Sequence, residues 1–196
     1  MIRSQNLNNA FFSSSKDGNL DEIFEGFGFQ KQVATMEQSH SSEMAFAETS
    51  TSYKCDGIYT NKTQLALVVK TADCVPILME SNKGVSATHA GWRGLEKSIF
   101  EESIKVHEIS SLKISIGPHA RKCCYEVGFE FLEKFNNSIN KVEDKYFLDL
   151  TKDIKQFAFE NNINLEDTDK CTICNEEYFS YRKNKTSERQ FSFIWI

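Results

Sequence analysis

Short apolar runs separated by polar segments recur along this chain, and several have the two-residue period of β-strands. Two nearly continuous apolar runs flank the tight segment TADC, which is typical of short buried strands. The alternation of Val85, Ala87 and His89 predicts a third strand with these side chains on one face. The predicted strands are 64–70, 76–79, 84–89, 112–116 and 191–196, the last with a hairpin partner at 178–181.

Elsewhere the apolar residues follow the period of a helix. Leu95, Ile99, Val106 and Ile109 fall on one side of a helix that we expect over 95–109, with charged residues between them. Further helices are expected over 130–137 and 151–161. The first twenty residues, rich in serine and asparagine, are expected to form a loose entry or an edge rather than core. The mixture of strands and helices predicts a layered domain of the α/β or α+β class.

The length of 196 residues predicts one domain over 1–196, with no repeat or linker. A hydrophobic content of 40% predicts a buried core, and the net charge of −5 argues against a nucleic acid or an anionic membrane as the main partner. The longest aliphatic run, 65–69, is too short to cross a bilayer, and the start lacks an apolar signal core, so we expect a cytoplasmic protein. The sequence does not report the oligomeric state.

The cysteines are too few for a disulfide scaffold, so reduced thiols are expected. Adjacent cysteines do not readily form a relaxed disulfide, and the CxxC segment has no second CxxC to complete a four-thiolate zinc site. We therefore interpret both groups as buried small residues. The six cysteines are Cys55, Cys74, Cys123, Cys124, Cys171 and Cys174.

Candidate chemistry lies where predicted strands end. Cys74 and His89 stand at the ends of neighbouring predicted strands, and His40 is a third candidate for the same place. Two imidazoles and a thiolate suit zinc, and three protein ligands leave a fourth position open, as in catalytic sites. Singly, however, such residues are most often hydrogen-bonded core histidines or small buried cysteines. Pattern and spacing alone therefore do not decide whether these residues form a metal site.

The quoted segments resemble a known family. TADCVPIL, ATHAGWRG, ISIGPHARKCCYEVG and the C-terminal DKCTICNEEYFSYRKNKTSERQFSFIWI occur in the order found in the laccase-domain family. These bacterial proteins were first labelled multicopper polyphenol oxidases and later reassigned as purine nucleoside phosphorylases. The resemblance runs from about Gln38 to the C-terminus. It implies that His40, Cys74 and His89 hold a catalytic zinc ion, with Ser41 where the family often has glycine.

The resemblance also implies a fold and an activity. The fold would be α+β, a compact domain of mixed sheets covered by helices. The activity would be phosphorolysis of adenosine, inosine and guanosine, with purine nucleosides and phosphate as partners. Adenosine deamination and methylthioadenosine phosphorolysis would be side activities. Deamination has a physical route, since zinc activates water for attack at C6 of adenine.

Other residues are candidates for substrate contacts. Arg93 and Arg182 are candidates for a phosphate clamp, because guanidinium groups bind phosphate oxygens in pairs, although each is equally typical of a solvated surface. Asp73 either orients a ligand, acts as an acid or base, or caps the turn before Cys74. The role of Asp56 does not follow from the sequence. The basic run of Arg182, Lys183, Lys185 and Arg189 is expected to be a solvated hairpin loop in preference to the alternative, an anion-binding lip, and His107 is expected to be exposed.

Three alternatives remain at this point. A metal-free Cys–His hydrolase would use Cys74 as nucleophile, His89 as base and Asp73 as the group that orients it. A non-catalytic relative would keep the zinc without turnover. A copper-dependent polyphenol oxidase is the third, although a multicopper centre needs more imidazoles than the four histidines of this chain provide.

Overall fold

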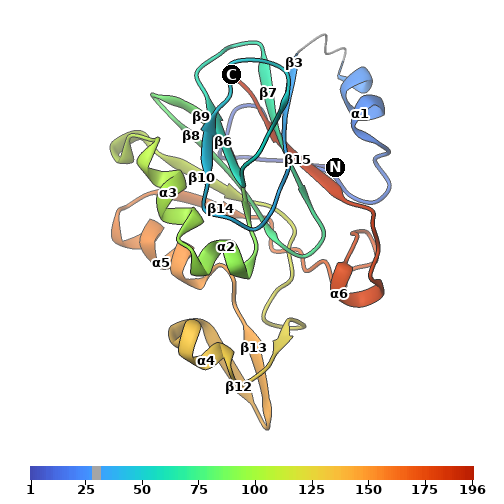
Figure 1. Cartoon of the computed structure of the whole chain (residues 1–196), viewed down its shortest axis with the longest axis vertical. Coiled ribbons are helices and arrows are strands. Elements are labelled where there is room, and N and C mark those ends of the chain that lie inside the picture. Colours follow the sequence, from blue (N-terminus) through green and yellow to red (C-terminus); the bar gives the residue numbers. More distant parts are fainter. Residues whose placement is uncertain (28–31) are drawn as a thin grey trace.

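The computed structural model describes residues 1–27 and 32–196, and two large β-sheets form its centre (Figure 1). The first sheet has the strand order β1-β2-β15-β7-β3-β5. Its strands pair antiparallel except at β7-β3 and β3-β5, which are parallel. Their bounds are β1 (Ile2–Arg3), β2 (Ala10–Phe12), β15 (Gln190–Ile194), β7 (Leu65–Thr71), β3 (Gln32–Met36) and β5 (Ser52–Tyr53).

The second sheet has the order β14-β10-β8-β9-β6-β4. Its central strands are antiparallel, and each end carries one parallel pair, β10-β14 and β4-β6. The strands are β14 (Asn164–Asp167), β10 (Lys113–Ile116), β8 (Val75–Ser81), β9 (Gly84–Ala90), β6 (Gly57–Thr60) and β4 (Met44–Phe46).

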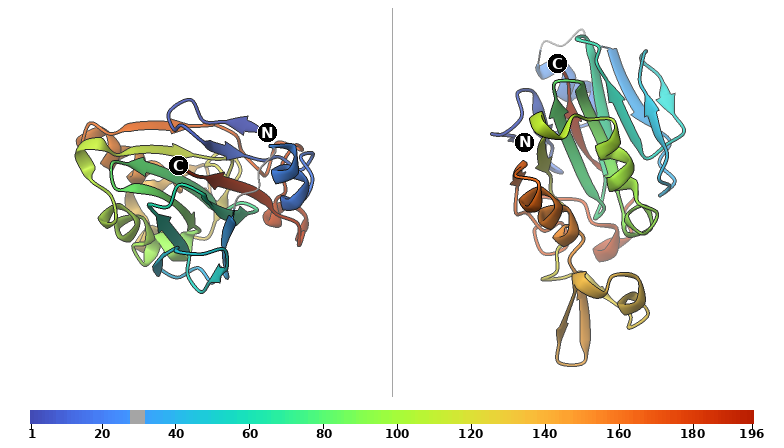
Figure 2. Two further views of the ribbon diagram at one scale, coloured as in Figure 1. Left: turned by 90° about the horizontal axis from the view of Figure 1, so that it is seen from above. Right: turned by 90° about the vertical axis from the view of Figure 1, so that its left-hand side faces the viewer.

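A third, small sheet projects from one end of the molecule together with a short helix, as Figure 1 and the right-hand view of Figure 2 show. Its order is β11-β13-β12, all antiparallel. The elements of this projection are β11 (Glu126–Val127), β13 (Lys145–Leu148), β12 (Ile139–Val142) and helix α4 (Phe131–Lys134).

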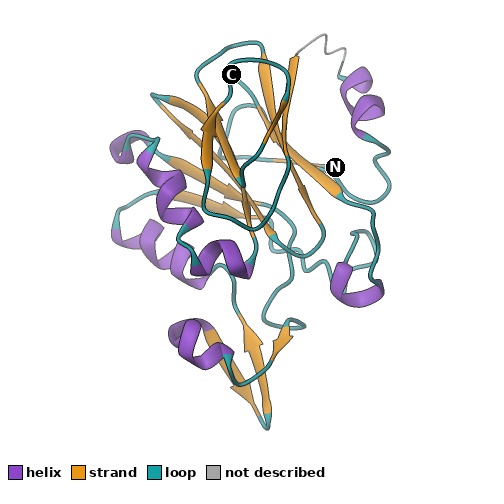
Figure 3. Cartoon of the chain, in the orientation of Figure 1, coloured by secondary structure: helices purple, strands orange, loops and turns teal. Residues whose placement is uncertain are grey.

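Helices cover the outer faces of the two large sheets (Figure 3). Helix α1 packs on the outer face of the first sheet through Ile23 and Phe24, and α3 and α5 pack on the second through Phe100 and Ile154. The remaining bounds are α1 (Leu20–Gly26), α2 (Trp92–Glu96), α3 (Ile99–Lys105), α5 (Lys152–Glu160), α6 (Tyr181–Asn184) and the 3₁₀ turns Ile109–Ser111 and Asn136–Ser138.

This four-layer order explains why the central strands are apolar along their whole length. In β7, Leu67 faces the second sheet while Val68 faces α1, so both faces of the strand are buried. In β8, Leu78 packs between the sheets while Ile77 packs against the helical layer. The α+β class expected from the sequence is confirmed, as are strands close to the positions predicted for β7, β8, β9, β10 and β15.

The predicted helix over 95–109 is divided in the structure. Helix α2 ends at Glu96, and α3 starts at Ile99 after Ser98, which has a left-handed backbone with φ of 69°. The last predicted turn is a separate 3₁₀ turn. A single helix would place Leu95 and Ile109 on one straight face, whereas the break at Ser98 separates α2 from α3, which packs on the second sheet through Ile99, Phe100 and Ile104.

Three further expectations are wrong. Residues 178–181 form no hairpin with β15, which pairs instead with β2 and β7. The first twenty residues are not peripheral throughout, since β2 lies inside the first sheet and Phe12 is fully buried. His107 is buried, not exposed, because Ser81 and Ser86 hydrogen-bond its two ring nitrogens at 2.9 and 2.7 Å.

None of the helices in the described part of the chain is long and apolar enough to cross a membrane.

Candidate functional site

His40, Cys74 and His89 come together where the two large sheets meet. His40 follows β3 of the first sheet, Cys74 lies in the turn from β7 to β8, and His89 lies in β9, paired with Pro76 of β8. One ligand atom from each of the three residues lies within 4.8 Å of the others. The Cys74 sulfur is 3.7 Å from His40 Nε2. Segments far apart in the chain thus build one cluster.

Asp56 fixes the orientation of this cluster. Its carboxylate is fully buried and accepts a hydrogen bond of 2.7 Å from His89 Nδ1. Because Nδ1 keeps its proton in this hydrogen bond, Nε2 is the ring nitrogen that can give up its proton and bind a metal ion. Although burial raises the pKa of Asp56, hydrogen bonds from His89 and Ser41 hold it well below its usual range.

The same carboxylate also shapes the backbone that carries His40. The backbone N–H groups of Ser39, His40 and Ser41 all donate to Asp56, at 3.1, 3.0 and 2.6 Å. His40 has a left-handed backbone with φ of 60°, a conformation that costs a non-glycine residue about 1 kcal/mol or more. Three converging hydrogen bonds to a buried charge offset that strain and keep His40 facing Cys74.

The cluster holds a charge pair. Burial alone would raise the pKa of Cys74, but the charge of His89 and the hydrogen bond with His40 lower it to about 6. Burial lowers the pKa of His89, but the Cys74 thiolate and the Asp56 carboxylate raise it to about 9. The geometry therefore favours a thiolate at neutral pH, which is the form that binds metals and acts as a nucleophile.

The residues fit a zinc ion. A thiolate and two imidazoles are ligands that zinc prefers, and three protein ligands leave one position open. Gly91 keeps room beside them, because a Cβ at this position would lie 2.7 Å from His40 Cδ2 and 2.8 Å from Cys74 Sγ. Any larger residue at Gly91 would push two of the candidate ligands out of place.

A cavity of about 580 Å³ opens from this cluster. Besides the three candidate ligands it exposes aromatic rings and, among the described residues, five cationic side chains. Its lining consists of Gln38, His40, Lys70, Thr71, Ala72, Asp73, Cys74, His89, Trp92, Arg93, Tyr125, Tyr181, Arg182, Lys185 and Arg189.

The structure places the predicted substrate residues on the wall of this cavity. The Arg93 guanidinium lies 4.4 Å from the centre of the Trp92 ring. The Arg182 guanidinium lies 4.8 Å from the centre of the Tyr125 ring and donates to the backbone oxygen of Glu126. Both arginines are exposed at the cavity.

Asp73 also lines the cavity, but both of its carboxylate oxygens accept hydrogen bonds from the protein. Thr172 Oγ1 donates to one oxygen at 2.7 Å, and the Arg182 backbone N–H donates to the other at 2.6 Å. The hydrolase hypothesis named Asp73 as the carboxylate that orients His89. In the structure the carboxylate hydrogen-bonded to His89 is that of Asp56. Asp73 thus ties the turn that bears Cys74 to the start of α6.

Some residues of the site were missed by sequence reasoning. Asp56 was noted without a role, and Tyr125 and Lys70 gave no signal at all. The basic run was interpreted as a solvated hairpin loop, yet it overlaps the short helix α6, and Lys185 and Arg189 line the cavity together with the predicted Arg182. Its density of positive charge in an acidic chain was the signal that could have identified it. His119, in contrast, is buried outside the cavity lining, with Nδ1 hydrogen-bonded to the Gly117 carbonyl.

Comparisons with known proteins agree with this geometry. A family described as multi-copper polyphenol oxidoreductase laccase matches residues 13–196. The chain is 38% identical over 148 residues to a purine nucleoside phosphorylase of Aquifex aeolicus, covering 72% of this chain and 70% of that protein. It is 32% identical over 199 residues to purine nucleoside phosphorylase YfiH of Escherichia coli, covering 91% and 79%.

Solved structures share the fold. The crystal structure of hypothetical protein YfiH from Bacillus licheniformis matches with a TM-score of 0.79 at 22% identity, covering 89% of this chain and 78% of that one. YlmD from Geobacillus stearothermophilus matches with a TM-score of 0.76 at 22% identity, covering 97% and 84%.

Proposed function

This chain belongs to the multi-copper polyphenol oxidoreductase laccase family, and from that premise we propose that it is a zinc-dependent purine nucleoside phosphorylase acting on adenosine, inosine and guanosine. The relatives from Aquifex aeolicus and Escherichia coli carry the name of this activity. The observation that carries the proposal is the cavity, in which a His–Cys–His cluster, aromatic rings and a set of cations share one space.

The cations supply the phosphate subsite. Lys70, Arg93, Arg182, Lys185 and Arg189 face the cavity, and among the residues that the structure describes Asp73 is the one carboxylate of the lining. In a chain with a net charge of −5 this concentration of positive charge favours an anionic ligand. One guanidinium group can bind two phosphate oxygens at once. Arg93 and Arg182 can therefore position the attacking phosphate and balance its negative charge.

The aromatic rings supply the nucleoside subsite. Trp92, Tyr125 and Tyr181 line the same cavity and offer flat faces on which a purine can stack. The volume of about 580 Å³ lies within the range of small-molecule sites. Each of these rings has a cation of the lining over it, Arg93 over Trp92, Arg182 over Tyr125 and Lys185 over Tyr181, so the groups for a purine and for a phosphate adjoin one another in one cavity.

The reaction joins a phosphate oxygen to C1′ of the ribose while the bond from C1′ to the purine nitrogen breaks. The electron pair of that bond goes to the purine, which then takes a proton, so ribose 1-phosphate and free base are the products. His40, Cys74 and His89 would hold the zinc ion, with Asp56 orienting His89. When bound, zinc supplies a Lewis acid that stabilises developing negative charge.

The side activities belong to the same proposal. Methylthioadenosine shares adenine and ribose with adenosine, so the aromatic walls offer it the same subsite. Deamination of adenosine would replace the C6 amino group with the oxygen of a water molecule and release ammonia, so it requires C6 to lie beside the ion that His40, Cys74 and His89 would hold.

A multicopper oxidase is not favoured by the residues. Such a centre needs many imidazoles, and the chain has four histidines. Two of them, His107 and His119, are buried away from the cluster and hydrogen-bonded elsewhere.

The test is a product assay on protein purified without chelator or nickel resin. Each nucleoside is incubated with and without phosphate, and base and ribose 1-phosphate are quantified by chromatography. We expect base and ribose 1-phosphate in equal amounts, and only when phosphate is present. Inosine formed from adenosine without phosphate would report the deaminase activity.

The Cys74→Ala variant tests the metal site. We expect a folded protein that loses its cavity zinc and its phosphorolysis, measured by metal analysis, circular dichroism and the same assay. Unchanged zinc content in this variant would contradict the ligand assignment. Zinc at the cluster with no product from any purine nucleoside would instead identify a non-catalytic zinc-binding relative.

A second candidate, a Cys–His hydrolase, is favoured by one observation. Cys74, His89 and Asp56 form a chain of nucleophile, base and orienting carboxylate, and the pKa of Cys74 is lowered to about 6. Such an enzyme would keep its activity after zinc removal and lose it on alkylation of Cys74. Loss of activity on zinc removal, restored by added zinc, would support the phosphorylase.

A further inference from the structure

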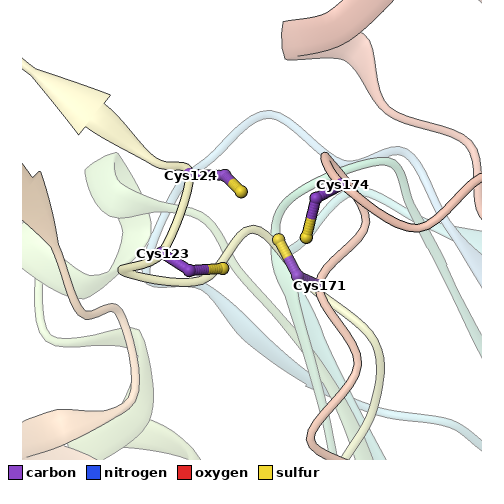
Figure 4. Close-up of side chains that lie close together, drawn as sticks. All are labelled: Cys123, Cys124, Cys171 and Cys174. Atoms are coloured by element: carbon purple, nitrogen blue, oxygen red, sulfur yellow. The ribbon is translucent and has the colours of Figure 1, made fainter.

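Four cysteines gather at a second place, outside the cavity lining. The sulfur atoms of Cys123, Cys124, Cys171 and Cys174 lie within 4.8 Å of one another, and all four are free thiols. Figure 4 shows the four sulfurs turned toward a common space. Two come from the turn before β11 and two from the loop between β14 and α6. Residues almost fifty positions apart therefore meet in one cluster.

Packing does not explain this cluster. The interpretation of these cysteines as buried small residues holds for Cys171, which is 7% exposed, but Cys123 and Cys174 are exposed. Because these two thiols remain in contact with water, the hydrophobic effect does not explain why the four sulfurs lie together. The sequence indicated no second CxxC segment that could complete a four-thiolate site with Cys171 and Cys174. In the structure the adjacent pair Cys123-Cys124 supplies the other two thiols.

The backbone holds the sulfurs in place. The turn that bears the adjacent pair is closed by the Cys124 N–H, which donates to the Arg121 oxygen at 2.9 Å. The CxxC turn is closed by the Asn175 N–H, which donates to the Cys171 oxygen at 3.2 Å. The two segments are joined directly, because the Thr172 N–H donates to the His119 oxygen at 3.0 Å. The sulfur of Cys171 accepts backbone hydrogen bonds as well.

We propose that Cys123, Cys124, Cys171 and Cys174 bind one zinc ion in a closed four-thiolate site. In a tetrahedral site with Zn–S bonds of about 2.3 Å, neighbouring sulfurs are about 3.8 Å apart, so the observed cluster needs only a small contraction. The thiols release their protons to solvent on binding, and no oxidant is required. With all four positions filled by protein, the site is structural rather than catalytic.

The bound ion would fasten two walls of the cavity to each other. Tyr125 follows Cys124 directly and lines the cavity. Thr172 follows Cys171 directly and donates to Asp73 beside Cys74. Through these neighbours the four-thiolate site supports the cavity without touching a substrate.

The test compares metal content in a Cys74→Ala background, which removes a ligand of the cavity cluster. Protein is loaded with zinc under reducing conditions, dialysed exhaustively without chelator and analysed for zinc. We expect the further change Cys123→Ser with Cys174→Ser to lower the zinc content by one ion per chain. Both residues are exposed, so the fold is expected to persist. The matched control Cys55→Ala, a cysteine outside both clusters, should leave the content unchanged.

Cobalt supplies a measurement that does not depend on the serine variant. Cobalt(II) added to the metal-free Cys74→Ala protein should give an intense sulfur-to-metal charge-transfer band typical of four thiolates, with a tetrahedral visible spectrum. Equal zinc content with and without the two serines would overturn the proposal. A disulfide among the four cysteines, found by mass spectrometry of the unreduced chain after alkylation, would overturn it as well.

Discussion

Asp56 is the residue on which the geometry of the candidate zinc site depends. It accepts hydrogen bonds from the His89 ring and from the backbone that carries His40, so one side chain orients two of the three candidate ligands. Ligand-orienting carboxylates of this kind fix the tautomer of the histidine and raise its basicity. Asp56 is therefore a positioning residue.

Replacing Asp56 with asparagine keeps its shape and removes its charge. We expect the zinc affinity of the cavity site to fall by roughly 10- to 100-fold, measured by competition with a chromophoric chelator. Ser41→Ala is the control, because it removes one hydroxyl from the same carboxylate while the Ser41 N–H still donates. An Asp56→Asn variant that is folded and binds zinc as tightly as wild type would refute this role.

Sequence reasoning could find the three candidate ligands but not the residue that arranges them. Cys74 and His89 stand at the ends of neighbouring predicted strands, so the pattern allowed them to converge, and the family resemblance singled them out together with His40. The partners of Asp56 lie 15 to 33 positions away in the chain, and no periodicity links them. Likewise, Tyr125 and Lys70 reach the cavity only through the tertiary fold.

At the scale of single elements, the boundary between α2 and α3 is a point of strain. Ser98 has φ of 69°, is exposed and makes no side-chain cap to α3. An ordinary residue in this left-handed region costs free energy that glycine does not.

Ser98→Gly is therefore expected to raise the free energy of unfolding by roughly 0.5 kcal/mol, after the larger entropy of the unfolded glycine chain is subtracted. Glu101→Gly, at an exposed position inside α3, should lower it by about 1 kcal/mol. Urea unfolding of both variants gives the comparison. A lower free energy of unfolding for Ser98→Gly than for wild type would show that the left-handed backbone of Ser98 does not destabilise the folded protein.

Helix α6 and the residue that caps its C-terminus carry two lysines, Lys183 and Lys185, with different surroundings. Lys185 lines the cavity, whereas Lys183 lies 3.5 Å from Glu176 and is not part of the lining. If the cavity binds phosphate, Lys185→Gln should raise the KM for phosphate roughly 2- to 5-fold, while Lys183→Gln should leave it unchanged. Steady-state kinetics with varied phosphate measures both. Equal effects of the two changes would place the phosphate elsewhere.

Elements with a clear period were predictable, and their pairing was not. The apolar runs of β7 and β8 indicated buried strands because both faces of each are covered. The hairpin at 178–181 was predicted because these residues are close to β15 in the sequence. That prediction was wrong, since the partners of β15 are β2 and β7, which are far away in the chain. The break at Ser98 also lay hidden inside an uninterrupted helical period.

At the scale of the whole molecule, the buried His107 makes stability depend on pH. Burial, together with the nearby Lys83 charge, lowers its pKa from 6.5 to about 4. Above pH 6.5 both the folded and unfolded forms are neutral. As pH falls from 6.5 to 4, the unfolded chain takes up a proton that the folded protein does not, so stability decreases.

The loss at this site is expected to reach about 3 kcal/mol near pH 4. Urea unfolding of wild type and His107→Gln between pH 7 and pH 4.5 measures it, since the variant should lose less stability over this range. His119 has its pKa lowered to about 4 in the same way, so some dependence should remain in the variant. Parallel curves for the two proteins would contradict the assignment.

The position of β15 has a consequence for synthesis. This strand lies between β2 and β7, although those strands come from residues 10–12 and 65–71. Until residues 190–194 leave the ribosome, the strands of this sheet could pair only as two half-sheets with open edges, β1-β2 on one side and β7-β3-β5 on the other. Such edges are sites of unwanted pairing. β15 follows all the other described strands in the sequence, so it can join the two half-sheets only after they have been translated, and until then their edges would be open to chaperones.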